Sequence, residues 1–182
     1  MSFSFSKATK GLVAGGVAVM IAANGFAATQ GTVGATSTGD LDISLTVVDE
    51  VRISNLADVT LGQFLGSDLS GTSPACVFRS GTGRYEITAT GDGGTAGDEF
   101  ALVDGANSVD YSVTYDDGSG ATALVSGTAL PGQTGGDEAS NTCANTGDNG
   151  TIAVTVLAAD MAGLPAGAYN GTLTLLLSLI HI

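Results

Sequence analysis

The residue types that carry most enzyme chemistry are scarce in this chain. Among 182 residues there is one histidine, His181, and there are two cysteines, Cys76 and Cys143. Both lysines, Lys7 and Lys10, lie close to the N-terminus. Serine and cysteine nucleophiles need a histidine or lysine base beside them. His181 is therefore the single candidate base in the rest of the chain.

That histidine lies in an unusual C-terminal sequence. Residues 177–182 read LSLIHI, which can be encoded by a DNA sequence that resembles the transposase end used to prepare sequencing libraries. We expect residues 177–182 to be an adapter artefact, so that His181 is not a natural residue and the true C-terminus is unknown. Ser-His-Asp, Cys-His and Ser-Lys mechanisms are then excluded by composition.

Paired carboxylates could still support glycosidase-type catalysis. The adjacent pairs are Asp98-Glu99, Asp116-Asp117 and Asp137-Glu138. All three lie in glycine-rich stretches, where acidic residues usually serve solubility and turn geometry. The chain also has no tryptophan to stack on a sugar. We expect no catalytic residues and no enzyme activity.

The same acidic turns raise the question of calcium, which binds closely spaced oxygen ligands. Two sets could converge: Asp92, Asp98 and Glu99, or Asp137, Glu138 and Asp148. Neither has the fixed spacing of a known calcium loop, and we expect no metal and no cofactor. The pattern Gly91-Asp92-Gly93 reads as a turn in an acidic setting, which argues against phosphate binding.

The N-terminus has the features of an export signal. Lys7 and Lys10 precede an apolar run over residues 12–23, which is followed by Gly25-Phe26-Ala27. This order of charged, apolar and small residues is typical of a cleaved signal peptide. We predict a signal over residues 1–27, cleavage after Ala27 and no membrane insertion of the mature chain, since no segment has the roughly 20 apolar residues of a spanning helix.

The predicted mature chain is strongly acidic. It contains all 18 acidic residues but only three cations, Arg52, Arg79 and Arg84, for a net charge of −15. Such a surface repels phosphate backbones and anionic headgroups. We therefore expect no nucleic acid partner and no binding to a membrane surface.

Both cysteines lie in the exported part of the chain. An oxidising compartment favours a disulfide over a metal site or a free nucleophile. We predict a disulfide between Cys76 and Cys143.

Apolar and polar residues alternate along much of the chain, which is the periodicity of β-strands. Leu41, Ile43, Leu45 and Val47 share one face of such a segment. Further predicted strands are 59–64, 85–90, 100–103, 109–115, 121–130, 151–157 and 169–177, and one helical turn is predicted at 158–162. Short strands at this spacing favour an all-β antiparallel sandwich over residues 41–176, preceded by a flexible segment over 28–40.

Two segments resemble a known family. TGDLDISLTV at residues 38–47 is similar to the N-terminal donor segment of pilins from archaic chaperone-usher fibres. PAGAYNGTLTL at residues 165–175 is similar to the closing strand of their spore coat protein U domain. One departure is clear: the family usually has a cysteine after the first alternating run, where this chain has Asp49-Glu50-Val51.

The resemblance implies an immunoglobulin-like sandwich that lacks its last strand. In such pilins a periplasmic chaperone lends a strand first, and the N-terminal segment of another subunit replaces it at an outer-membrane usher. The implied donor residues are Leu41, Ile43, Leu45 and Val47, and the implied groove-edge residues are Tyr169, Leu173 and Leu175. The implied function is a structural subunit of a surface fibre that serves adhesion or biofilm formation.

A second hypothesis remains at this stage. Residues 41–47 could be an ordinary first strand of a complete, secreted sandwich that acts alone as a binding or adhesin domain, with or without calcium. Such a domain would be monomeric, whereas a donor-acceptor subunit would form ladders of oligomers.

Overall fold

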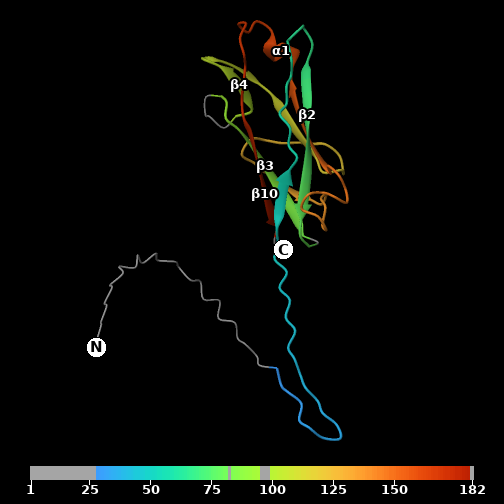
Figure 1. Ribbon diagram of the computed structural model, residues 1–182. Coiled ribbons are helices and arrows are strands. Elements are labelled where there is room, and N and C mark those ends of the chain that lie inside the picture. The colour runs from blue at the N-terminus through green and yellow to red at the C-terminus, as the bar shows by residue number, and fades with distance from the viewer. Residues whose placement is uncertain (1–27, 82, 95–98, 181–182) are drawn as a thin grey trace, which may run out of the picture. The chain divides into compact units, whose positions relative to one another are not determined.

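The computed structural model describes residues 28–81, 83–94 and 99–180 (Figure 1). The predicted signal over residues 1–27 lies outside the described residues. The chain separates into two units, Met1–Thr46 and Val47–Ile182.

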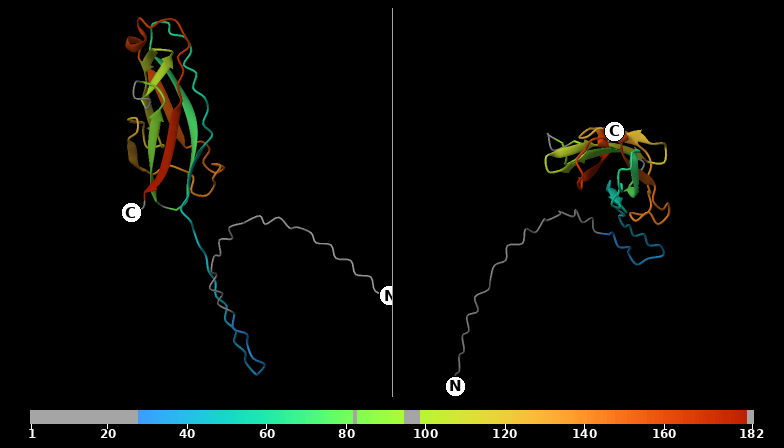
Figure 2. Two further views of the ribbon diagram at one scale, coloured as in Figure 1. Left: turned by 90° about the vertical axis from the view of Figure 1, so that its left-hand side faces the viewer. Right: turned by 90° about the horizontal axis from the view of Figure 1, so that it is seen from above.

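The second unit is built from antiparallel β-sheets, which confirms the predicted all-β sandwich fold (Figures 1 and 2). One sheet has the order β1-β2-β9-β6-β7, the other has the order β10-β3-β8, and β4 and β5 form a separate hairpin. The strands are β1 (Val51–Ser54), β2 (Leu69–Arg79), β3 (Arg84–Gly91), β4 (Ala101–Asp104), β5 (Asn107–Asp110), β6 (Ser112–Asp116), β7 (Thr122–Ala123), β8 (Ala129–Gln133), β9 (Gly150–Val156) and β10 (Leu173–Ile180).

A single short helix, α1 (Ala158–Met161), is present among the described residues, at the position of the predicted helical turn. Its first N–H, from Ala158, donates to the carboxylate of Asp68 at 2.7 Å. Within the described part of the chain, no helix combines the length and apolar character needed to cross a membrane.

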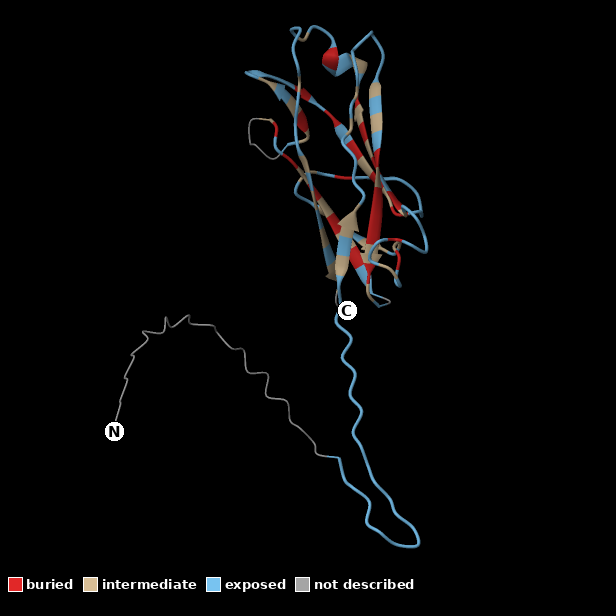
Figure 3. Ribbon diagram, viewed as in Figure 1, coloured by how far each residue is buried: buried red, intermediate tan, exposed pale blue. Residues whose placement is uncertain are grey.

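The core lies between the two sheets, where every second residue of a strand points inward. In β3 the inward residues Tyr85, Ile87 and Ala89 are fully buried, and in β9 Ile152 and Val156 are almost so. Figure 3 shows these buried positions in red alternating with paler ones along the strands. Alternation in the sequence therefore predicted the inward face of β3 and β9 correctly.

Two strands were not predicted from the sequence. β2 contains Gly71 and Pro74, which weaken a strand pattern, and β1 has only four residues. In β2 the half that contains Pro74 pairs with β9, whereas β1 pairs only with residues 76–79. Pro74 thus lies where one side of β2 has no ladder, a position that tolerates a missing N–H.

Several predicted strands were wrong in extent, three of them in the segments before β10. Residues 59–64 belong to no strand, although Val59 and Leu61 pack against the core. The segment 109–115 is divided at Tyr111, whose N–H donates to the carbonyl of Phe100 instead of continuing one ladder. The segment 121–130 is divided between β7 and β8, which lie in different sheets. The cause in each case is a tertiary contact that periodicity does not encode.

The loop between β8 and β9 is fastened to the end of β2. Cys76 and Cys143 form the expected disulfide. The side chain of Asn149 accepts from the N–H of Val77 and donates to its carbonyl, both at 2.9 Å. The N–H of Asp137 donates to the same carbonyl at 2.8 Å. The disulfide thus closes a loop that is also held by backbone-directed hydrogen bonds.

Candidate subunit-interaction site

Four apolar side chains at alternate positions are exposed to solvent in the N-terminal part of the described chain. The side chains of Leu41, Ile43, Leu45 and Val47 are 69%, 88%, 88% and 73% exposed. Residues 28–50 are all exposed, as the pale blue segment in Figure 3 shows, and residues 41–47 belong to no strand. Regularly spaced exposed aliphatic residues of this kind mark interaction surfaces. We refer to residues 41–47 as the donor segment, after the role that the resemblance implies for them.

The chain folds back immediately before the donor segment. Thr29 and Asp40 exchange both backbone hydrogen bonds, at 2.9 and 3.0 Å. This pair closes a hairpin over residues 30–39, so that the extended apolar stretch begins at Leu41. The donor segment therefore has a defined N-terminal limit.

β10 is the edge strand of its sheet. It pairs with β3, from Leu173 opposite Gly91 to Ile180 opposite Arg84, and with no other strand of the described residues (Figure 2). Its core-facing leucines are Leu173, Leu175, Leu177 and Leu179, of which the last two belong to the segment 177–182 that we expect to be adapter-derived. All four pack against the core but stay partly exposed, in contrast to the fully buried positions of β3. Large apolar side chains that face a core and are not covered indicate room for another strand at this edge.

The structure corrects one of the predicted edge residues. Leu173 and Leu175 lie in β10, but Tyr169 precedes it, because the strand begins at Leu173 and not at 169. Asn170 instead bridges Val103, and the N–H of Thr172 donates to the carboxylate of Asp92 at 2.6 Å. These bonds hold residues 170–172 away from the β3 ladder.

The second sheet also ends beside this edge. β1 is the outermost strand of its sheet and contacts β10. The chain then continues from β1 as an extended segment across β2, where the N–H of Ala57 donates to the Ser73 hydroxyl at 2.8 Å. Close approach requires a glycine here: a Cβ on Gly71 would lie 2.6 Å from the side chain of Val59. The edges of both sheets thus meet on one side of the unit.

The acidic turns do not form a cation site in the part of the chain that the structure describes. No group of three or more potential ligands converges there. Glu138 pairs with Arg79, and Asp148 accepts from Asn55. Asp137 is bound by the N–H groups of residues 139, 140 and 145, the first of which contributes most to lowering the pKa of its carboxyl. Of the other set, Asp98 lies outside the described residues.

Asp117 has a structural role in its turn. Burial alone would raise the pKa of Asp117, but hydrogen bonds from the Ser119 hydroxyl and from the N–H groups of Gly135, Thr134 and Ser119 outweigh it and lower the pKa to about 2. The backbone donors at 134 and 135 both lie 2.9 Å from the carboxylate. The predicted acid pair Asp116-Asp117 therefore shapes the loops at this end of the sandwich.

Two buried tyrosines form a polar contact inside the core. The hydroxyl oxygens of Tyr85 and Tyr115 lie 2.6 Å apart. Burial raises the pKa of both phenols, to about 12 for Tyr115. Both phenols are therefore neutral at physiological pH, and one hydroxyl donates a hydrogen bond to the other.

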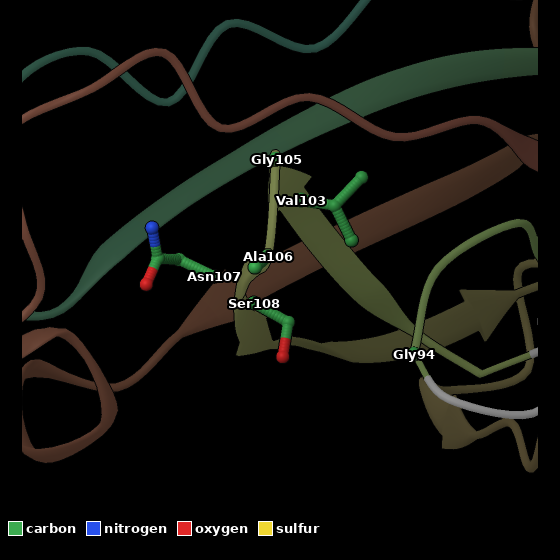
Figure 4. Close-up of a pocket in the computed structure, with 6 residues that line it drawn as sticks. All are labelled: Gly94, Val103, Gly105, Ala106, Asn107 and Ser108. Atoms are coloured by element: carbon green, nitrogen blue, oxygen red, sulfur yellow. The ribbon is translucent and has the colours of Figure 1, made fainter.

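Two cavities among the described residues are small and open. One of about 140 Å³ lies at the turn between β4 and β5, lined by Gly94, Val103, Gly105, Ala106, Asn107 and Ser108 (Figure 4). Its side chains offer one amide and one hydroxyl and no charged group. A second, of about 210 Å³, lies between Tyr111, Leu157 and Asp160. The lining of the second also includes the hydroxyl residues Ser112 and Thr155 and the carboxylate of Asp110.

Comparison with known proteins adds information on the fold. No family model and no curated sequence matches the chain. The structure is similar, with a TM-score of 0.50 and 14% identity, to a chain from work described as "Chaperone-tip adhesin complex is vital for synergistic activation of CFA/I fimbriae biogenesis". The match covers 73% of this chain and 42% of that chain. This protein therefore has a sandwich fold that is also found in a fimbrial chaperone-adhesin complex, and it spans less than half of the chain it matches.

Proposed function

We propose that the protein is a structural subunit of a surface fibre, assembled by insertion of the donor segment of one copy into the sandwich of another. The observation that carries this proposal is the exposed stripe of Leu41, Ile43, Leu45 and Val47. Four aliphatic side chains at strand spacing, exposed in their own subunit, gain about 1.5 to 3 kcal/mol each when they are buried. Burial in a second copy supplies that gain.

The edge of β10 supports the proposal from the acceptor side. An added strand would pair with the free backbone groups of β10 and cover the partly exposed leucines below it. This mode of binding needs neither a cofactor nor a catalytic residue. We accordingly propose a non-enzymatic role with no metal.

The implied partners follow from the same edge. A subunit with an open strand edge and uncovered core residues needs protection before it assembles. A periplasmic chaperone that lends a strand and an outer-membrane usher that exchanges it are the partners we propose. The protein would then pass through the periplasm to the cell surface, where the fibre serves adhesion or biofilm formation.

A matched pair of substitutions tests the function. Ile43→Asp places an acid on the apolar face of the donor segment, and Ser44→Asp places the same acid on the opposite face. A buried, unpaired carboxylate costs more than the lost side chain contributes. We expect Ile43→Asp to abolish heat-resistant oligomers and Ser44→Asp to retain them, on unheated gels of protein co-expressed with its chaperone.

Chaperone pull-down separates the two hypotheses. The donor segment lies outside the strands of its own subunit, so Ile43→Asp should leave the chaperone complex intact. Loss of all soluble Ile43→Asp protein would instead assign residues 41–47 to the subunit's own sandwich. Oligomers that persist in Ile43→Asp would exclude the donor role.

A further inference from the structure

The linker between the donor segment and β1, residues 48–50, is held by Ser80. The Ser80 hydroxyl donates to the carbonyl of Val48 at 2.9 Å and accepts a hydrogen bond from the N–H of Glu50. The N–H of Ser80 donates to the carbonyl of Glu50 at 2.8 Å. A single residue therefore engages three backbone groups of the linker.

Ser80 is itself held in place by its neighbours. It directly follows Arg79, the last residue of β2. The buried guanidinium of Arg79 donates to the carbonyls of Gly81 and Gly83, at 2.9 and 2.8 Å, and pairs with Glu138. The backbone on both sides of Ser80 is thus fastened, so Ser80 is a fixed point to which the linker is bound.

The donor segment could pair with β1 of its own chain if the linker formed a turn. A three-residue turn over 48–50 would place Val47 opposite Val51. Leu45 would then lie opposite Ile53, and opposite residues of a hairpin share one face. Val51 and Ile53 pack against the core and are only partly buried. The apolar face of the donor segment would then be covered within its own chain.

Self-insertion of this kind would compete with fibre assembly. In the sheet order, β1 pairs with β2 and with no other strand of the described residues, and it contacts β10. A hairpin on the free side of β1 would occupy the place that the donor segment of a second copy needs. A three-residue linker also gives the donor segment a high effective concentration at its own β1. A fibre subunit therefore needs a device that disfavours this hairpin.

The sequence of the linker also opposes a turn. It reads VDE and contains neither glycine nor asparagine. Three-residue hairpin loops usually end in a residue with positive φ, a conformation that costs energy for other residue types. Glu50 would occupy that position. Among the described residues, the non-glycine residues with positive φ are Asn55 and Cys143, so Glu50 has a different conformation. Turn formation would strain Glu50 and break its two bonds to Ser80.

We propose that Ser80 is a positioning residue that holds residues 48–50 out of a hairpin turn and so keeps the donor segment available to a second copy. This inference rests on the proposed function. Leu45 and Val47 are 88% and 73% exposed, which is the state that such a clamp maintains. The clamp acts on the choice between insertion into the same chain and insertion into another chain.

Removal of the Ser80 hydroxyl tests the clamp. Full exported chains that carry the natural C-terminus are refolded by dilution, and size-exclusion chromatography with light scattering separates monomers from polymers. Ser80→Ala should raise the fraction of monomer that cannot polymerise by about 5- to 30-fold, as expected for the loss of two hydrogen bonds. Hydrogen exchange of that monomer should show protected amides at residues 44–47. A subunit that is merely destabilised would leave these amides unprotected.

Two variants serve as controls for Ser80→Ala. Ser80→Thr keeps the hydroxyl and should retain the wild-type ratio of polymer to monomer. Ser70→Ala removes a hydroxyl from an exposed position of β2, and it should also polymerise as wild type does.

A glycine at the end of the linker tests the turn with Ser80 left in place. Glu50→Gly permits a positive φ, whereas Glu50→Ala removes the same carboxylate without that freedom. We expect Glu50→Gly to increase the protected monomer and Glu50→Ala to polymerise as wild type does. This pair keeps the test decisive even where Ser80→Ala fails to fold.

The possible outcomes separate the clamp from the proposed function. The clamp is overturned if Ser80→Ala or Glu50→Gly polymerises as wild type does, or if their monomers leave residues 44–47 unprotected. Wild-type monomers in which residues 44–47 are already protected would overturn it as well. Wild type that forms neither polymer nor protected monomer would overturn the proposed function itself.

Discussion

At the scale of single residues, the carboxylates of this protein serve its turns. Asp117 and Asp137 are 7% and 2% exposed, which is unusual for charged residues, and each accepts several backbone N–H bonds. A carboxylate in such a setting is favoured in its charged form, as the lowered pKa of each group shows. Acidic residues that looked like solvated turn residues in the sequence thus organise the loops after β6 and β8.

Asp117 should make stability depend on acid. Its folded pKa is about 2, below the ordinary value of 3.8, so its contribution is fully present above about pH 4 and is lost as the pH falls toward 2. We expect Asp117→Asn to lower the free energy of unfolding at pH 7 by about 1 to 2 kcal/mol and to flatten its decrease between pH 4 and pH 2. Urea unfolding monitored by tyrosine fluorescence measures both effects.

An exposed acid provides the comparison for Asp117. Asp110→Asn removes the same charge from an exposed position and controls for net charge at pH 7. If Asp117→Asn and Asp110→Asn have equal stability at pH 7, the hydrogen bonds to Asp117 contribute nothing measurable.

At the scale of elements, β10 combines two roles in one strand. Leu175 faces the core and is partly buried, whereas its neighbour Leu176 is 62% exposed on the other face. One edge of the strand bonds to β3, and the opposite edge is free among the described strands. The strand therefore packs on the core of its own chain and has one backbone edge with no strand partner among the described residues.

The two faces of β10 should respond differently to the same substitution. Leu175→Asp brings a carboxylate into contact with the core and should destabilise the subunit by about 3 kcal/mol or more. Leu176→Asp changes an exposed side chain and should cost less than about 1 kcal/mol. Limited proteolysis of each variant in its complex with the proposed chaperone, at increasing denaturant concentration, compares the stabilities of the two variants. Equal sensitivity of the two variants would show that the face assigned to the core is wrong.

At the scale of the whole molecule, one covalent link connects the end of β2 to the loop before β9. Cys76 and Cys143 are 67 residues apart in the chain. In the chain-entropy model, closing a loop of this length stabilises the folded state by about 4 kcal/mol. The disulfide therefore adds stability to a sandwich in which the leucines of the edge strand β10 are only partly buried.

Loss of the disulfide should weaken the subunit before it weakens the fibre. We expect Cys76→Ser with Cys143→Ser to lower the free energy of unfolding by about 2 to 4 kcal/mol. In the fibre that we propose, the edge of β10 is covered, so fibres should resist the same loss better than free subunits. Chemical unfolding of refolded subunits and of fibres, with and without reductant, measures both. A double variant as stable as the oxidised wild type would contradict the first expectation.

Much of this architecture is encoded locally. The alternation over residues 85–90 and 151–157 predicted the buried faces of β3 and β9, because a strand with one face in the core needs apolar residues at every second position. The inventory of thiols in an exported chain likewise predicted the Cys76–Cys143 pair, because an oxidising compartment leaves few other fates for two cysteines.

Other features depended on the tertiary structure. β2 carries Gly71 and Pro74, and it is a strand because β9 on one side and the chain around Val59 on the other accommodate them. Tyr169 has strand-like neighbours but is held outside β10 by the hydrogen bonds of residues 170–172. Here long-range partners override local preference.

The donor segment shows most clearly what the sequence alone cannot predict. Residues 41–47 and residues 85–90 have the same alternation, yet Ile43 is 88% exposed and Ile87 is fully buried. Alternation determines which side chains can share one apolar face, and so the sequence alone predicted that each segment could add to a sheet. Only the tertiary structure decides whether the covering sheet belongs to the same subunit, because burial depends on neighbours that lie far away in the chain.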